Sequence, residues 1–244
     1  MNLRVFDTRA ELFQGAAEEF ARRAEQAVCE RGRFCVALSG GSTPQGLFNL
    51  LAGGDFPGVP WDKTFLFWGD ERHVPPHHPD SNYRMTRETL LSKVPVPAEN
   101  VFRIRAEEAS ADAAAAEYEQ TLRKFFQLGQ GQFPRFDLTL NGVGVDGHTA
   151  SLFPGTPVLE EKTRLSAAVW VEKFKSFRIT LTFPVFNQAA CVLFLVTGKE
   201  KAPALRAIYK STGLTPPAAR ISPTNGELLW FADQEAAEGL PARS

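Results

Sequence analysis

Cysteine is scarce in this chain, and long apolar runs and an excess of either charge are missing. The three cysteines, Cys29, Cys35 and Cys191, are odd in number and show no C-x-x-C spacing. Each lies in an apolar-patterned segment, so we expect each to be a small buried side chain. A thiol nucleophile is therefore not indicated.

No apolar run approaches the roughly 20 residues that a membrane-spanning helix needs. Residues 1–7 lack a basic region followed by an apolar core, so no secretory signal is predicted. The formal net charge is −1, which indicates no surface built for nucleic acid or anionic lipid. These absences predict a soluble cytoplasmic protein that binds neither nucleic acid nor membranes.

The 244 residues, 43% hydrophobic and 23% charged, are ordinary for a globular protein and predict one domain over residues 1–244. Strand-length apolar runs alternate with segments of helical periodicity, which predicts an open, mostly parallel, Rossmann-like α/β sheet with helices on both faces. Strands are predicted at residues 34–38, 64–68, 101–104, 136–140, 167–171, 177–183, 190–196 and 228–231. Helices are predicted at residues 8–31, 45–52, 82–93, 107–127 and 202–210, and residues 234–244 are expected to fray.

The stretch from residue 136 to 155 carries the strongest chemical signal. An apolar run breaks into Gly142 and Gly144, where the backbone can take positive φ and approach a ligand closely. Asp146 and His148 follow at the carboxyl end of the expected strand, the edge where open α/β sheets bind ligands. A carboxylate beside a histidine can fix its tautomer and make it a better base. A solvated glycine turn is the alternative.

A second strand is followed directly by Ser39-Gly-Gly-Ser-Thr-Pro44. Free N–H groups at a helix N-terminus, together with the hydroxyls of Ser39, Ser42 and Thr43, suit a phosphate. The loop is not G-x-G-x-x-G and lacks the lysine of a P-loop, which disfavours a dinucleotide or a nucleotide triphosphate. An ordinary turn of small residues remains the alternative.

Two further strand ends carry charge, at residues 69–72 (GDER) and 198–201 (GKEK). Arg72, Arg178 and Lys201 could bind a phosphate, although each could equally be a solvated surface charge. His73, His77 and His78 invite a metal interpretation, but the prolines among them make a helix unfavourable, and no metal is predicted.

In four stretches the chain resembles the 6-phosphogluconolactonase family. They are SGGSTP at 39–44, GDER at 69–72 followed by SNY at 81–83, GVGVDGHTASLFPG at 142–155 and GKEKA at 198–202. The resemblance implies a fold shared with glucosamine-6-phosphate deaminases and ribose-5-phosphate isomerases. It also implies hydrolysis of 6-phosphoglucono-δ-lactone, a small phosphosugar lactone, without metal or organic cofactor. The oligomeric state is left open as a monomer or small homo-oligomer.

Carried over by position, His148 matches the general base of that family and Asp146 the acid beside it. The matched phosphate and substrate ligands are Ser39, Gly40, Gly41, Ser42, Thr43, Arg72, Arg178 and Lys201. Lys201 is preferred to Lys199 because it precedes Ala202 in the G-x-x-K-A pattern. We also assign Asp70, Asn82 and Gly144 to substrate binding, and a glycine N–H near 142 or 144 as the candidate for stabilising the oxyanion.

Two rival functions remain open. A sugar-phosphate isomerase or deaminase of the same fold resembles this chain, but the deaminases use a glutamate a few residues beyond the histidine, and residues 149–155 contain no acid. A non-catalytic phosphosugar sensor would use the same residues only to bind, and could dispense with His148.

Overall fold

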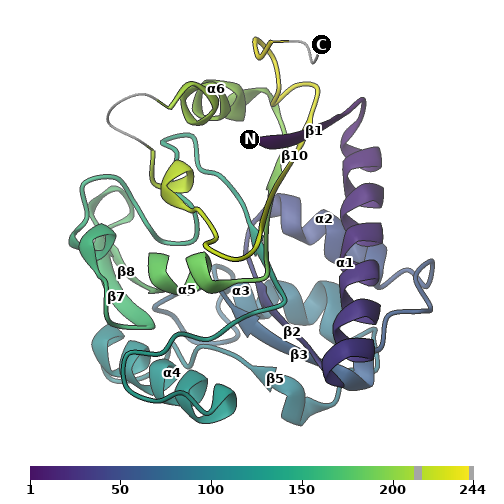
Figure 1. The fold of residues 1–244 in the computed structure, drawn as a ribbon. Helices are drawn as coiled ribbons and strands as arrows, with labels where there is room; N and C mark the ends of the chain where they lie inside the picture. The colour runs from purple at the N-terminus through teal and green to yellow at the C-terminus, as the bar shows by residue number, and fades with distance from the viewer. Residues whose placement is uncertain (212–215, 242–244) are drawn as a thin grey trace.

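The computed structural model describes residues 1–211 and 216–241 of the chain. Its centre is a parallel sheet of seven strands in the spatial order β1-β10-β9-β6-β2-β3-β5 (Figure 1). These strands are β1 (Asn2–Phe6), β2 (Phe34–Leu38), β3 (Thr64–Trp68), β5 (Val101–Phe102), β6 (Leu138–Asn141), β9 (Cys191–Val196) and β10 (Glu227–Asp233). A smaller antiparallel sheet has the order β4-β8-β7 and consists of β4 (Asp70–Arg72), β7 (Ser166–Val171) and β8 (Ser176–Leu181).

Helices cover the central sheet on both sides. They are α1 (Arg9–Arg31), α2 (Ser42–Leu51), α3 (Asn82–Thr86) with a π-helical turn over Arg87–Leu91, α4 (Ala111–Phe126), α5 (Phe183–Gln188) and α6 (Ala202–Lys210). In Figure 1, α1 lies on one side of the sheet, and α4 with β7 and β8 lies on the other. The predicted open, mostly parallel sheet with helices on both faces is confirmed.

Side-chain alternation along the strands explains the two layers. Phe34 of β2 packs edge-on against Phe20 of α1, with ring centroids 5.2 Å apart. Phe67 of β3 points to the opposite face and meets Phe125 of α4 at 5.1 Å. Successive strand residues face opposite sides of a sheet, so a continuous apolar strand can bury one aromatic residue under each layer.

The first helix follows its sequence signals closely. Thr8 and Glu11 form a reciprocal capping box at its start, and Gly32, with φ of 70°, ends it by donating its N–H to Val28 O at 2.8 Å. One expectation is wrong: Cys29 is exposed, because it lies off the buried stripe that runs through Ala24 and Ala27. The expectation of buried thiols is confirmed for Cys35 and Cys191, and burial raises the pKa of each to about 12.

Several boundaries differ from the sequence prediction. Strands β1 and β4 were not predicted, and residues 183–188 form helix α5, where Pro184 fits the first turn. Helix α4 begins at Ala111 because Ser110 caps it, accepting from the N–H of Ala113 at 3.1 Å. Residues 234–241 do not fray, since Ala236 is fully buried; residues 242–244 of that predicted tail lie outside the described residues.

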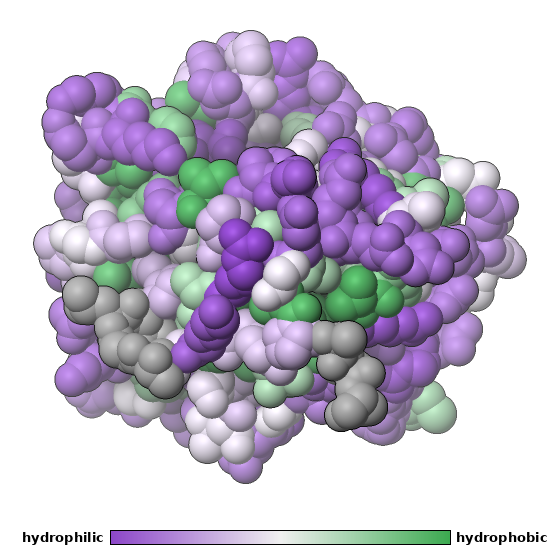
Figure 2. All heavy atoms as spheres, turned by 90° about the horizontal axis from the view of Figure 1, so that it is seen from above, coloured by the Kyte–Doolittle hydropathy of each residue, from purple (hydrophilic) through white to green (hydrophobic). Residues whose placement is uncertain are grey.

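No helix within residues 1–211 and 216–241 combines the length and hydropathy that crossing a membrane requires. Seen from above relative to Figure 1, the surface is mainly hydrophilic, and its hydrophobic residues lie in small separate patches (Figure 2).

Candidate functional site

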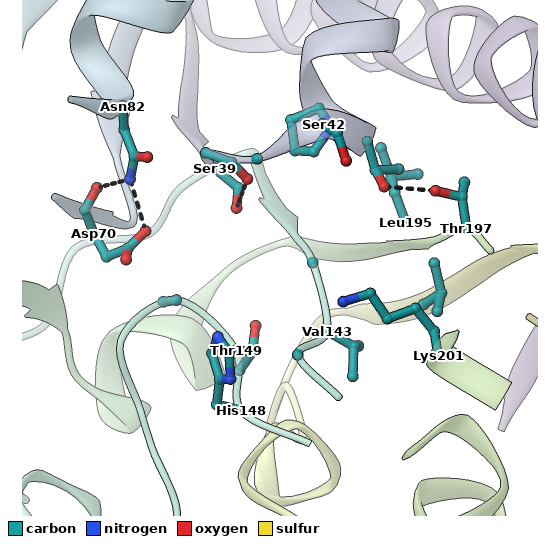
Figure 3. Close-up of a pocket in the computed structure, with 18 of the residues that line it drawn as sticks. Ser39, Ser42, Asp70, Asn82, Val143, His148, Thr149, Leu195, Thr197 and Lys201 are labelled. Carbon is teal, nitrogen blue, oxygen red and sulfur yellow. Dashed lines mark hydrogen bonds between the residues drawn. The ribbon is translucent and has the colours of Figure 1, made fainter. Parts of the chain in front are cut away.

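A cavity of about 210 Å³ opens at the carboxyl ends of β2, β6 and β9, beside β4 (Figure 3). Most of the predicted site residues line it: Ser39, Gly40, Gly41, Ser42, Thr43, Asp70, Arg72, Asn82, Gly144, His148 and Lys201. Asp146 and Arg178 are not among its lining residues. The strand ends that looked separate in the sequence therefore meet at one place, as the rule for parallel sheets predicts.

One wall of the cavity is the N-terminus of α2. The helix begins at Ser42, earlier than predicted, and Gly41 occupies the N-cap position with φ of 101°, a conformation that favours glycine. No side chain caps this end, so the first N–H groups of the helix are available to a ligand. The hydroxyls of Thr43 and Thr197 are 2.7 Å apart and fix each other. This wall suits an anion.

The opposite wall presents the imidazole of His148. Its backbone N–H donates to Asp146 Oδ1 at 3.2 Å, and its ring Nδ1 is hydrogen-bonded to the same oxygen. Because Nδ1 is occupied by Asp146, Nε2 is the nitrogen left for a ligand. The Asp-x-His turn therefore brings together the pair that the sequence predicted.

Glycines make this turn possible, in a different way from the one expected. Positive φ occurs at Gly147 (78°), not at Gly142 or Gly144. Gly144 is needed for space, since a Cβ there would lie 2.0 Å from Nδ1 of His148. Its N–H donates to His148 O at 2.8 Å and is therefore engaged within the turn, while an oxyanion role for a glycine N–H near 142 or 144 stays a prediction.

The environment of His148 lowers the pKa of its imidazole. The ring stacks on buried Phe153, with centroids 3.9 Å apart and planes 26° from parallel. Burial is the largest effect and outweighs Asp146, which acts to raise the pKa of the imidazole. Burial would raise the pKa of Asp146, but the hydrogen bonds and charge of His148 and the charge of Lys173 lower it. A neutral imidazole beside an ionised carboxylate is the resulting state at neutral pH.

A buried polar network holds Asp70 at the cavity. Asn82 Nδ2 donates to the backbone oxygen of Asp70 at 2.9 Å and to its Oδ1 at 3.2 Å (Figure 3). Ser151 Oγ donates to Oδ2 at 2.6 Å. A Cβ on Gly40 would lie 1.8 Å from Asn82 Oδ1, so only glycine lets the 39–44 loop pack this closely. Asp70 is thus fixed with both oxygens engaged.

The two arginines lie side by side, because Arg72 of β4 pairs with Arg178 of β8. Arg72 lines the cavity and donates through Nη1 to Asp80 O at 2.5 Å. The Arg178 guanidinium lies over the ring of Phe174, 5.0 Å from its centroid. Burial, followed by the charge of Arg72, lowers the pKa of Arg178. Arg178 therefore lies beside Arg72 and outside the cavity lining.

The two lysines after β9 are separated by the structure. Lys201 extends its amino group towards the cavity (Figure 3). Lys199 points elsewhere and pairs with Glu238 at 3.4 Å. Within residues 1–211 and 216–241, no group of three or more His, Cys, Asp or Glu side chains lies close enough to hold a metal ion.

Sequence reasoning left out two side chains that matter here. Thr197 lines the cavity and fixes Thr43, and Ser151 fixes Asp70. Thr197 follows an apolar strand, as the other site residues do. This position could have identified it as a site residue from the sequence. Ser151 had none, because its partner is 81 residues away in the sequence.

Known proteins resemble this chain in sequence and in fold. The family model described as glucosamine-6-phosphate isomerases/6-phosphogluconolactonase matches residues 7–230. A protein of Nostoc sp. named 6-phosphogluconolactonase is 43% identical over 218 residues, which cover 88% of each chain. The solved 6-phosphogluconolactonase from Trypanosoma cruzi has a TM-score of 0.88 and 30% identity, covering 99% of this chain and 97% of that one.

A structure titled as a monomeric glucosamine-6-phosphate deaminase has a TM-score of 0.82, covering 97% of this chain and 99% of that one, but only 20% identity, and shows the shared fold alone. The match over most of the sequence and the high identity to the Nostoc protein are decisive. This chain belongs to the glucosamine-6-phosphate isomerase/6-phosphogluconolactonase family.

Proposed function

We propose that this protein hydrolyses 6-phospho-D-glucono-1,5-lactone to 6-phospho-D-gluconate, the second step of the oxidative pentose phosphate pathway. The observation that carries the proposal is the placement of His148 across one cavity from the N-terminus of α2 and Lys201. A phosphorylated sugar has its anion at one end and its lactone carbonyl at the other. The cavity offers cationic and N–H donors for the first and a neutral imidazole for the second.

Binding comes first in the mechanism. The phosphate is held by the N–H groups and hydroxyls of the 39–43 loop, with Lys201 and Arg72 balancing its charge. Arg178, whose strand pairs with that of Arg72, adds positive charge beside it. The fixed acceptors of Asp70 and the nearby Asn82 face the sugar hydroxyls. These contacts place the lactone carbonyl carbon near His148.

The chemistry then needs one proton carrier. Nε2 of neutral His148 takes a proton from a water as its oxygen attacks C1, giving a tetrahedral oxyanion and an imidazolium that Asp146 stabilises through Nδ1. The bond between C1 and the ring oxygen breaks, and the imidazolium returns its proton to that oxygen. The products are a carboxylic acid, which ionises, and a hydroxyl, and His148 is neutral again.

The deaminase alternative lacks an acid. Residues 149–155 contain no glutamate, and Ser151 instead hydrogen-bonds Asp70. Incubation with glucosamine 6-phosphate should release no ammonia above the level of a blank. Clear turnover of that substrate would reverse the choice between the two activities.

The direct test is hydrolysis of freshly generated 6-phosphogluconolactone, corrected for its spontaneous opening. We expect a rate proportional to the concentration of the protein. A rate equal to the spontaneous one would refute the lactonase and leave the sensor alternative.

The pH profile of kcat/KM should show an acid limb with a midpoint below 6.5. Burial lowers the pKa of His148, the neutral form acts as the base, and the activity is therefore lost as the pH falls through that pKa. The rates are measured between pH 5 and pH 8, with the spontaneous reaction subtracted at each pH. A midpoint clearly above the ordinary histidine value of about 6.5 would contradict the proposed environment.

Replacing Lys201 with methionine is expected to raise KM about tenfold with a smaller change in kcat. The substitution keeps an unbranched side chain only one atom shorter and removes a charged hydrogen-bond donor to the phosphate. Lys199→Met is the matched control, since Lys199 pairs with Glu238 and does not line the cavity. Equal KM values for both variants would show that Lys201 does not hold the phosphate.

We further propose that residues 1–244 act as one domain, because the cavity draws on residues from Ser39 to Lys201. A small phosphorylated lactone is its substrate, and we retain the sequence-based expectations of a cytoplasmic enzyme and of a monomer or small homo-oligomer.

A further inference from the structure

The two oxygens of Asp146 have different partners. Oδ1 takes both contacts from His148. Oδ2 lies 3.8 Å from Nζ of Lys173 and forms an ion pair with it. Since a carboxylate rotates about its Cβ–Cγ bond, a partner on the second oxygen fixes where the first one points.

Lys173 comes from the short turn between β7 and β8. This turn is a 3-10 helix over Glu172–Phe174 that ends at Lys175, which has φ of 49° and donates its N–H to Glu172 O at 3.2 Å. The carboxylate of Glu172 also accepts from Nε1 of Trp170 at 2.8 Å and from the side chain of Lys175. The turn is therefore tied to its own strands and gives Lys173 a defined origin.

The same turn also packs against the aromatic ring that stacks on His148. Phe174 packs edge-on against Phe153, with centroids 5.9 Å apart, and Phe153 stacks on His148. The Nζ of Lys173 lies 5.5 Å from the centre of the Phe174 ring. The turn thus contacts Asp146 through the charge of Lys173, and it contacts Phe153, the ring that stacks on His148.

Resting on the proposed function, we infer that Lys173 is a positioning residue, which holds the carboxylate of Asp146 in the plane that keeps Oδ1 on Nδ1 of His148. Lys173 does not line the cavity. Lys173 affects catalysis through Asp146. It keeps the Asp146 carboxylate ionised, and it keeps the imidazole of His148 oriented.

The direction in which the pKa of His148 changes when Lys173 is removed distinguishes positioning of Asp146 from a long-range charge effect. The charged groups that face His148 are Asp146 and Asp70, which raise its pKa, and Lys201, which lowers it. If Lys173 positions Asp146, its loss lets the carboxylate turn away and lowers the pKa of His148 further. If Lys173 acted only as a remote cation, its loss would raise that pKa.

The experiment compares wild type with Lys173→Met and Lys173→Arg, by NMR titration of the His148 ring and by lactone hydrolysis. We expect Lys173→Met to shift the titration of His148 to lower pH, and to lower kcat about threefold to fivefold at unchanged KM, the factor that a partly exposed ion pair supports. Lys173→Arg keeps the charge and should restore both values.

Lys175→Met is the matched control. Lys175 belongs to the same turn but pairs with Glu172, and its side chain is 73% exposed, against 54% for Lys173. A titration midpoint in Lys173→Met that is unchanged or higher than in wild type overturns the inference. The titration needs no substrate, so an inactive wild type would refute the proposed function without affecting this result.

Discussion

Replacing His148 with glutamine is expected to lower kcat for lactone hydrolysis by about 10²–10⁴-fold, the range that a positioned general base contributes. Glutamine keeps a polar side chain of similar reach but cannot accept a proton from the attacking water. Because we propose that α2 and Lys201 hold the phosphate at the far wall, binding of the product 6-phosphogluconate should change little. The measurements are steady-state rates and calorimetric titration with the product.

His77→Gln is the matched control for this variant, since His77 is exposed and does not line the cavity. We expect its kcat to equal that of wild type. If His148→Gln retains the full rate, a different base carries the reaction and the mechanism is wrong. If it loses binding as strongly as rate, the imidazole contributes to holding the substrate rather than to proton transfer.

The parallel sheet was predictable because its strands are buried on both faces. Such strands appear as continuous apolar runs, and residues 34–38 and 64–68 were predicted with the observed boundaries. The edge strand β1 was missed because its buried residues, Leu3 and Phe6, are separated by exposed ones and give no continuous run. Strand β4 was missed because three polar residues form it only through pairing with β8.

The site was predictable for a related reason. Carboxyl ends of parallel strands converge, so polar residues after separate apolar runs share one place in space. The sequence could not show in which direction each of these side chains points. Arg178 alternates with apolar neighbours on β8, and Arg72 ends the polar strand β4 beside it, yet only Arg72 reaches the cavity. Lys173 carried no signal, because its contact with Asp146 depends on where the turn between β7 and β8 lies relative to Asp146 and His148.

Replacing Glu71 with alanine is expected to lower the free energy of unfolding by about 3–5 kcal/mol, the largest stability effect we predict. Glu71 is 2% exposed, and its carboxylate accepts four hydrogen bonds. The donors are the backbone N–H groups of Arg72, Asn82 and Tyr83, at 2.7–2.8 Å, and the hydroxyl of Ser81 at 3.0 Å. Each buried donor left without an acceptor costs about 1 kcal/mol or more. Urea denaturation measures the change.

Two further variants show whether these hydrogen bonds are the cause. Glu71→Gln keeps one acceptor oxygen but turns an amide NH₂ towards the remaining donors. Its free energy of unfolding should therefore lie between those of wild type and Glu71→Ala. Glu88→Ala removes an exposed carboxylate that pairs with Arg84 in the same region, and should change the stability by less than about 1 kcal/mol. Because Glu71 anchors the start of α3, its loss should also displace Asn82 from Asp70 and raise KM. A Glu71→Ala protein as stable as Glu88→Ala would mean that water replaces the carboxylate without cost, and that Asn82 is held in the cavity by other contacts.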